Sequence, residues 1–270
     1  MLNIGVFGAT GKVGCEVVRI VAESPDLSLS LATTSSKNDA VDRFVKNDFP
    51  QLEEVVKYSS TPDESELSNS EVLIDFSLYH GITSNIELAV SSNCPYVVGV
   101  SGLDDAAKAA LNNAAKTIPI VYAHSTSLGV TVMRALVAQA AKLLDSSFDI
   151  EIHETHHRAK IDAPSGVAKV LAHDAAVARG LNPDNSIVSG RGEEAPLREA
   201  NQIAITSARG GRFNCHHDVS FHGDDETVTI SHTGQSRALF ARGAIAAARW
   251  LVNRPAGLYS MDDVLGIKEC

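Results

Sequence analysis

The stretch LNIGVFGATGKVG, residues 2–14, decides the expected fold of this chain. Its apolar first half predicts a strand, and the apolar residues at helical spacing from Val13 to Val21 predict a helix directly after the glycines. A strand, a glycine loop and a helix in this order form the first half of a βαβ unit. Glycines let the backbone approach a pyrophosphate, and the helix N-terminus stabilises its charge. The stretch therefore predicts a dinucleotide site, and the alternative is a tight turn that binds nothing.

The same alternation of strands and helices continues as far as residue 123. Four more apolar runs predict strands and two segments predict helices between them: strands at 27–32, 72–77, 95–102 and 118–123, and helices at 82–89 and 106–116. This order is typical of an α/β fold with a Rossmann-like, doubly wound parallel sheet. Ligands bind at the carboxyl ends of the strands in such a sheet.

The residues at these strand ends are therefore the predicted coenzyme-binding residues. They are Gly8, Ala9, Thr10, Gly11, Lys12, Val13, Thr34, Gly99, Val100, Ser101, Ala123, His124, Ser125 and Thr126.

The end of the second predicted strand bears on the choice of coenzyme. Many NAD sites place an acidic residue there, on the ribose hydroxyls. Here residues 33–37 supply hydroxyls and one lysine, with no carboxylate before Asp39, and Lys12 adds a second cation nearby. Hydroxyls and lysine can hold a phosphate, so we predict that NADPH is preferred to NADH.

The pattern changes near residue 128 and predicts a second domain. A long helix at 130–144 and a strand at 148–153 are followed by strand patterns at 203–206, 217–221 and 227–232. Strands without helices between them favour an α+β domain on an open mixed sheet. We predict a dinucleotide-binding domain over 1–127 and a substrate-binding and oligomerisation domain over 128–240, with 241–270 packing back on the first. Between the strands, residues 191–196 read as a polar loop.

The stretch ETHHRAKIDAPSGVAK, residues 154–169, holds the chemistry of the second domain. Two histidines, an arginine and a lysine fall within five positions, and a helix start follows them. Asp162 or Ser165 can cap that helix, and Pro164 suits its first position. Because a helix N-terminus binds anions, the stretch predicts a carboxylate or phosphate site with proton donors beside it. The alternative is a solvated basic loop before an ordinary helix.

Composition limits the classes of function. The net charge of −10 argues against a nucleic-acid or anionic-membrane surface, so the basic cluster suits a small anionic molecule. The four cysteines are far apart and form neither a disulfide framework nor a zinc ribbon. Residues 1–7 read as a strand rather than a signal peptide, and no apolar run has the length of a membrane span. We expect a cytoplasmic protein.

Three functions compete on these residues. The first is a nicotinamide-dependent reductase of a small dicarboxylate, with a proton from His156 or Lys160. The second is a zinc hydrolase with His153, His156 and His157 as ligands and Glu154 beside them, but adjacent histidines in an extended segment point in opposite directions. The third is a non-catalytic dinucleotide sensor, which has no need for a second anion site. We expect no metal, and we interpret four further histidines as surface or packing residues: His216, His217, His222 and His232.

The stretch at 154–166 resembles the signature of the 4-hydroxy-tetrahydrodipicolinate reductase family, the dihydrodipicolinate reductases of lysine and diaminopimelate synthesis. Residues 8–14, 74–77, 99–102 and 257–265 resemble other parts of that family, so the similarity covers nearly the whole chain. The resemblance implies NAD(P)H-dependent reduction of the ring, after loss of water, to tetrahydrodipicolinate. It also implies a homotetramer built through the second domain.

The resemblance also implies roles for single residues. His156 would be the catalytic acid/base, Lys160 the proton donor, and His157 a ligand of one substrate carboxylate. The other carboxylate would bind at the helix start, at Ser165, Gly166 and Val167. Two departures stand out: Val167 replaces the usual threonine, and residues 123–127 read Ala-His-Ser-Thr-Ser where Ala-Pro-Asn-Phe-Ser is usual.

Overall fold

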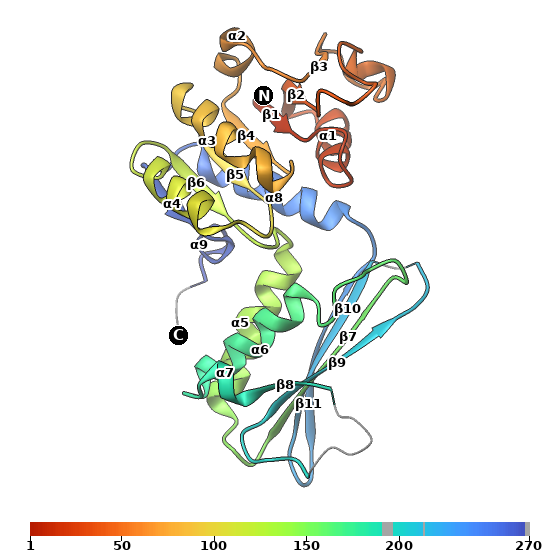
Figure 1. The fold of residues 1–270 in the computed structure, drawn as a ribbon, viewed down its shortest axis with the longest axis vertical. Coiled ribbons are helices and arrows are strands. Elements are labelled where there is room, and N and C mark those ends of the chain that lie inside the picture. Colours follow the sequence, from red (N-terminus) through yellow and green to blue (C-terminus); the bar gives the residue numbers. More distant parts are fainter. Residues whose placement is uncertain (191–196, 213, 268–270) are drawn as a thin grey trace. The chain divides into compact units, whose positions relative to one another are not determined.

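The computed structural model describes residues 1–190, 197–212 and 214–267, and the chain forms two compact units (Figure 1). The first unit comprises Met1–Leu128 and Arg237–Lys268, and the second comprises Gly129–Ser236. The polar loop that we expect at 191–196 lies outside the described residues. None of the described helices is long and apolar enough to span a bilayer.

The first unit is built on a parallel sheet. Its strands are β1 (Leu2–Phe7), β2 (Leu27–Thr33), β3 (Tyr58–Ser59), β4 (Val72–Asp75), β5 (Tyr96–Val98), β6 (Pro119–Tyr122) and β12 (Gly257–Tyr259). Among the described residues they make a seven-stranded sheet in the order β12-β6-β5-β4-β1-β2-β3, with parallel pairing throughout. The order reverses at β1, as in a doubly wound sheet, so the predicted fold class is confirmed.

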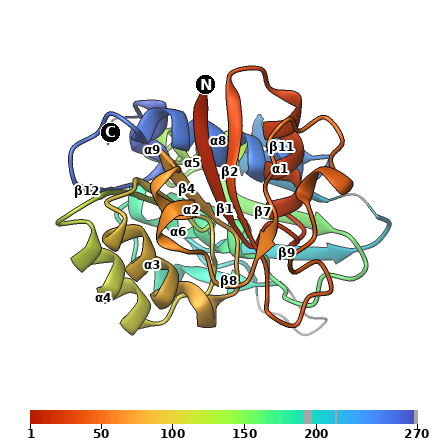
Figure 2. The ribbon, with the colours of Figure 1, turned by 90° about the horizontal axis from the view of Figure 1, so that it is seen from above.

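Helices cover both faces of this sheet. They are α1 (Gly14–Glu23), α2 (Glu64–Ser68), α3 (Ile82–Ser91), α4 (Asp105–Ala114), α8 (Ala238–Leu251) and α9 (Met261–Leu265), with 3-10 turns at Val45–Asn47 and Tyr79–Gly81. Figure 2 shows α1 and α8 along one face and α3 and α4 along the other. Each face has its own apolar core, because the central strands β4 and β5 are buried at every position and face both layers of helices.

The end of the chain completes the first unit. Helix α8 packs on α1 through a run of small residues, and the Cβ that Gly243 lacks would lie 1.6 Å from the carbonyl oxygen of Thr126. Strand β12 then extends the sheet beside β6. A glycine is therefore required at position 243, because the helix backbone approaches the end of the segment after β6 so closely.

The second unit is an α+β fold on a mixed sheet. Its elements are α5 (Leu128–Leu143), β7 (Asp149–His156), α6 (Gly166–Ala178), α7 (Pro183–Ser186), β8 (Ile187–Ser189), β9 (Ile203–Arg209), β10 (Cys215–His222) and β11 (Thr227–Gly234). The described strands follow the order β11-β10-β7-β9-β8, antiparallel on the β10 side of β7 and parallel on the β9 side. The predicted open mixed sheet is confirmed.

Two differences from the sequence-based expectations bear on the site. Strand β7 runs on to His156, three residues beyond the predicted end, because its pairing with β9 and β10 continues that far. Helix α6 begins at Gly166 with Ser165 as its N-cap, so Pro164 precedes the helix instead of occupying its first position. His156 and the start of α6 are thereby held by regular structure, with residues 157–164 as the loop between them.

Candidate active site

The glycine loop after β1 has the geometry of a pyrophosphate cradle. Gly8 adopts a φ of +77°, which a side chain would strain, and a Cβ there would lie 2.8 Å from the carbonyl oxygen of Phe76. A Cβ on Gly14 would lie 2.0 Å from the carbonyl oxygen of Gly8. Helix α1 begins at Gly14, so its N-terminus points its free N–H groups into this loop. These residues fit a reduced nicotinamide dinucleotide, whose phosphates they would hold.

Hydroxyl groups connect this loop to the end of β2. The Oγ1 atoms of Thr10 and Thr34 lie 2.6 Å apart, and Asn38 donates its side-chain N–H to Thr10 Oγ1 at 3.2 Å. Lys12 and Lys37 are exposed at the edge of the same region. The structure therefore brings together the residues that we expected at the ribose end of a coenzyme.

A cavity of about 360 Å³ lies beside Thr10, and one of the side chains that line it is an arginine that we did not expect there from the sequence. Arg43 lines it, paired with Asp48 at 2.5 Å, and Tyr58 donates its hydroxyl to the same carboxylate at 3.1 Å. Asp39 also lines the cavity. No periodic signal marks residues 38–50, so only the folded loop places Arg43 near Thr10.

The remaining predicted coenzyme-binding residues, at the ends of β5 and β6, differ in how exposed they are. Gly99 packs against the Phe76 ring, where a Cβ would lie 2.2 Å from a ring carbon, and Val100 is buried. Ser101 and His124 are exposed, Ala123 and Ser125 are half-buried, and His124 Nδ1 lies 3.4 Å from the Tyr122 hydroxyl. Thr126 is buried and donates its hydroxyl to the Phe240 carbonyl at 2.7 Å, so its side chain fastens α8.

In the second unit, the fully buried carboxylate of Glu154 organises the chemistry. Arg209 donates to both of its oxygens, at 2.8 and 2.9 Å, from the end of the neighbouring strand β9. Ser165 donates its backbone N–H to the same carboxylate at 3.2 Å. Burial acting alone would raise the pKa of Glu154, but the hydrogen bonds from Arg209, Ser207 and His156 lower it to about 2. The carboxylate therefore stays ionised in the interior.

Glu154 holds His156, which lies two residues further along the same face of β7. His156 Nδ1 is 2.5 Å from Glu154 Oε2, so Nε2 is the nitrogen left for proton transfer. Burial lowers the pKa of His156, Glu154 opposes that shift, and the positive charge of Lys160 reinforces it. The positive charge of Arg209 acts on His156 in the same direction as that of Lys160.

The loop after β7 carries the remaining predicted residues. Lys160 donates its Nζ to both carboxylate oxygens of Asp162, at 2.7 and 2.9 Å, and this pairing lowers the pKa of Asp162. His157 is half-buried, whereas His156 is buried, as expected for neighbours on an extended segment. His153, the third histidine of the zinc interpretation, bonds to Thr206 and Thr155 on the exposed side of β7.

The start of α6 is capped and offers an anion site. Ser165 Oγ accepts the N–H of Ala168 at 3.2 Å, while the N–H groups of Gly166 and Val167 belong to the first turn, which has no internal acceptor. Gly166 is exposed and Val167 half-buried. Ser165, Gly166 and Val167 therefore share the start of one helix, which contacts Glu154 through the backbone N–H of Ser165.

His217 is a member of this cluster that sequence reasoning treated as a packing residue. It is fully buried on β10, its Nε2 lies 3.2 Å from Ser165 Oγ, and its ring meets the His156 ring edge to face at a centroid distance of 5.2 Å. Burial lowers the pKa of His217 to about 3, so it is neutral. His217 is two residues from Cys215 and two from Val219, which are both buried. This alternation was the one signal in the sequence that the His217 side chain points into the core.

Comparison with known proteins decides the family. Two family models, described as dihydrodipicolinate reductase N-terminus and C-terminus, match residues 2–126 and 129–265. The chain belongs to the dihydrodipicolinate reductase family. It is 42% identical to the 4-hydroxy-tetrahydrodipicolinate reductase of Campylobacter curvus, over 99% of this chain and 100% of that protein. It is 38% identical to the enzyme of that name from Pseudoalteromonas translucida, over 98% of each chain.

A solved structure supports the fold. The dipicolinate-bound dihydrodipicolinate reductase of Paenisporosarcina sp. TG-14 is similar with a TM-score of 0.74 and 23% identity, covering 96% of this chain and 97% of that one. The resemblance found at 154–166 is thereby confirmed. The chain is an NAD(P)H-dependent oxidoreductase that reduces the dihydrodipicolinate intermediate of lysine and diaminopimelate biosynthesis. The zinc-hydrolase and sensor interpretations are set aside.

Proposed function

We propose that this dihydrodipicolinate reductase acts through His156 and Lys160, on a substrate whose two carboxylates bind at His157 and at the start of α6. The Glu154–His156 pair carries the proposal, because it presents one imidazole nitrogen for proton transfer beside a helix N-terminus. The substrate is 4-hydroxy-tetrahydrodipicolinate, which loses water to give dihydrodipicolinate, and the product is tetrahydrodipicolinate. The bound nicotinamide coenzyme supplies the hydride.

The chain's own residues supply the proton. Reduction of the ring places a hydride on one atom and a proton on its neighbour, so one general acid is needed per turnover. The ammonium group of Lys160 has three donors and no acceptor, and Asp162 orients it. His156 Nε2 can both accept and return a proton, while Glu154 keeps its ring in one orientation. We therefore assign Lys160 as the donor and His156 as the acid/base.

A coupled assay tests the activity itself. The condensation product of aspartate semialdehyde and pyruvate is supplied, and the loss of NADPH or NADH absorbance is followed. Oxidation of the coenzyme that depends on both the substrate and the enzyme supports the proposal. Absence of oxidation with a freshly formed condensation product, under conditions in which a curated relative is active, contradicts it.

Val167 gives a prediction about substrate affinity. Backbone N–H groups of the first turn of α6 hold the carboxylate in this proposal, so the hydroxyl that Val167 lacks is one donor among several. We expect Val167→Thr to lower KM for the substrate by several-fold at most. A hydrogen bond from the added hydroxyl to the carboxylate would be worth about 1.5–3 kcal/mol only where its loss leaves a partner unpaired. Steady-state kinetics measure it, and a hundredfold gain would show adaptation to a different ligand.

We further propose that NADPH is preferred to NADH, through KM. Thr34 and Thr10 offer hydroxyls and Lys37 offers positive charge around the end of β2, and Arg43, paired with Asp48, lines the cavity beside them; the first carboxylate in the chain after the strand is Asp39. We expect Lys37→Glu to reverse the preference and Arg43→Gln to reduce it. The ratio of kcat/KM for the two coenzymes measures both effects, with Lys46→Glu as a control on the same segment. A clear NADH preference in the unmodified enzyme contradicts the proposal.

We also propose a homotetramer built through the second unit, in the cytoplasm. The exposed side chains of β11, among them Val228, support an interface on that sheet. Cys15, Cys94 and Cys215 are free thiols, which suits a reducing compartment.

A further inference from the structure

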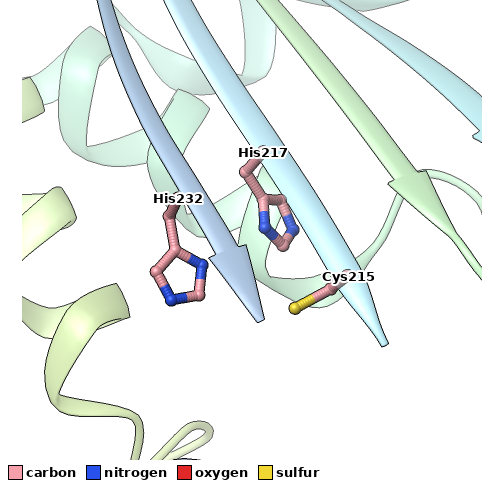
Figure 3. Close-up of side chains that lie close together, drawn as sticks. All are labelled: Cys215, His217 and His232. Atoms are coloured by element: carbon pink, nitrogen blue, oxygen red, sulfur yellow. The ribbon is translucent and has the colours of Figure 1, made fainter. Parts of the chain in front are cut away.

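Three metal-ligating side chains converge where β10 and β11 lie side by side. Cys215 and His217 are two residues apart on β10 and therefore share one face of the sheet, and His232 is directly opposite His217 on β11. Figure 3 shows the three side chains gathered beside these strands. Their ligand atoms all lie within 4.8 Å of one another.

Two nitrogen atoms in this group lack the partner that a buried polar atom needs. His217 is fully buried and uses Nε2 toward Ser165 Oγ, while its Nδ1 has no hydrogen-bond partner among the described residues. His232 Nδ1 is likewise buried and without a hydrogen-bond partner in the described part of the chain. Leaving such nitrogens unpaired is costly, so a ligand held between the rings would remove a penalty on both.

We infer that Cys215, His217 and His232 form a binding site for a zinc-class divalent cation. One thiolate and two imidazoles are a borderline-soft donor set, which suits Zn²⁺ and excludes the oxygen-seeking Mg²⁺ and Ca²⁺. Zinc–sulfur bonds of about 2.3 Å and zinc–nitrogen bonds of about 2.0–2.1 Å place tetrahedral ligand atoms roughly 3.3–3.6 Å apart. The ligand atoms lie within 4.8 Å of one another, so side-chain rotation would have to bring them closer, and water would take the fourth position.

The site would be structural, and it would act on the start of α6. A cation on His217 Nδ1 requires the ring proton to sit on Nε2, which then donates to Ser165 Oγ. Ser165 is the N-cap of α6 and accepts from Ala168 as well. With both of its lone pairs occupied, the Ser165 hydroxyl proton is free to donate to a ligand. The cation thus joins β10 to β11 and sets the donor direction of the capping serine.

Cobalt binding tests the site directly. The full chain without a histidine tag is stripped of metal with a chelator and titrated with Co²⁺, which reports a thiolate ligand by a near-ultraviolet charge-transfer band. We expect one Co²⁺ per chain, with that band, displaced by Zn²⁺. Cys215→Ser removes the band, and His232→Ala weakens binding at least about tenfold, since loss of even an outer partner of a ligand typically costs 10–100-fold.

Two matched variants serve as controls. His216→Ala removes the neighbouring histidine of β10, which points to the opposite face and bonds to Thr233 and Asp218, and Cys94→Ser removes a buried cysteine of the first unit. Both retain the band and the affinity. A wild-type chain without the thiolate band, or equal Co²⁺ affinity in wild type and His232→Ala, overturns the inference. Far-ultraviolet circular dichroism shows whether each variant is folded. If Cys215→Ser is unfolded, the Co²⁺ affinity of His232→Ala decides the test.

Discussion

Replacing His156 or Lys160 with alanine is expected to lower kcat by about 10²–10⁴-fold, the usual contribution of a positioned general acid or base. Each change removes a group that we propose to transfer or supply the proton, while the glycine cradle of the first unit is untouched. The dissociation constant of the coenzyme should therefore change little. Single-turnover kinetics measure the chemical step, and quenching of the coenzyme fluorescence measures its binding.

Lys169→Ala is the matched control for these two variants. It removes an exposed lysine from the first turns of α6, and it should leave kcat within a factor of about two to three of wild type, as for surface changes worth up to roughly 0.5 kcal/mol. Near-normal turnover in both His156→Ala and Lys160→Ala would show that neither residue supplies the proton. If Lys169→Ala loses activity as well, the loss in the other variants would come from the reduced positive charge of the region and not from a missing proton-transfer group.

Glu154→Ala is expected to have the largest effect on stability. It deletes a fully buried carboxylate and leaves Arg209, which makes two hydrogen bonds to it, without its charged partner and with only the carbonyls of Ala208 and Asp162 as acceptors. Breaking a buried ion pair in this way costs about 3–5 kcal/mol of unfolding free energy, and the part-exposure of Arg209 favours the lower end. The urea midpoint measures the loss. The kcat should fall about 10–100-fold too, because His156 loses the acceptor that orients it.

Glu151→Gln provides the comparison on the same strand. Glu151 pairs with Arg198 but is one-third exposed, so its loss should cost less than about 1 kcal/mol. Glu154→Gln should keep the shape of the site but present an amide N–H toward Arg209 or His156. Its cost in unfolding free energy should therefore lie between those of Glu154→Ala and Glu151→Gln. Equal costs for Glu154→Ala and Glu151→Gln would show that Glu154 is not the organising residue of the site.

Local signals in the sequence were enough for the architecture. The glycines at 8, 11 and 14 after an apolar run and the alternation to residue 123 identify a doubly wound sheet, because helix and strand periods and glycine requirements depend on near neighbours only. The stretch 154–166 likewise identified the family. Its two histidines and its lysine fall within five positions of the chain, so their proximity needs no tertiary fold.

What remained hidden depends on contacts between distant segments. Arg209 reaches Glu154 because β9 lies parallel to β7 in a register that pairs it with His156. His217 meets Ser165 only after β10 has paired with β7, and His232 meets His217 only after β11 has paired with β10. The sequence by itself determined the fold class and indicated the side chains that we propose to react. The tertiary structure alone decided which partners hold them, because those partners lie on strands far apart in the chain, and a local pattern does not show which strands pair.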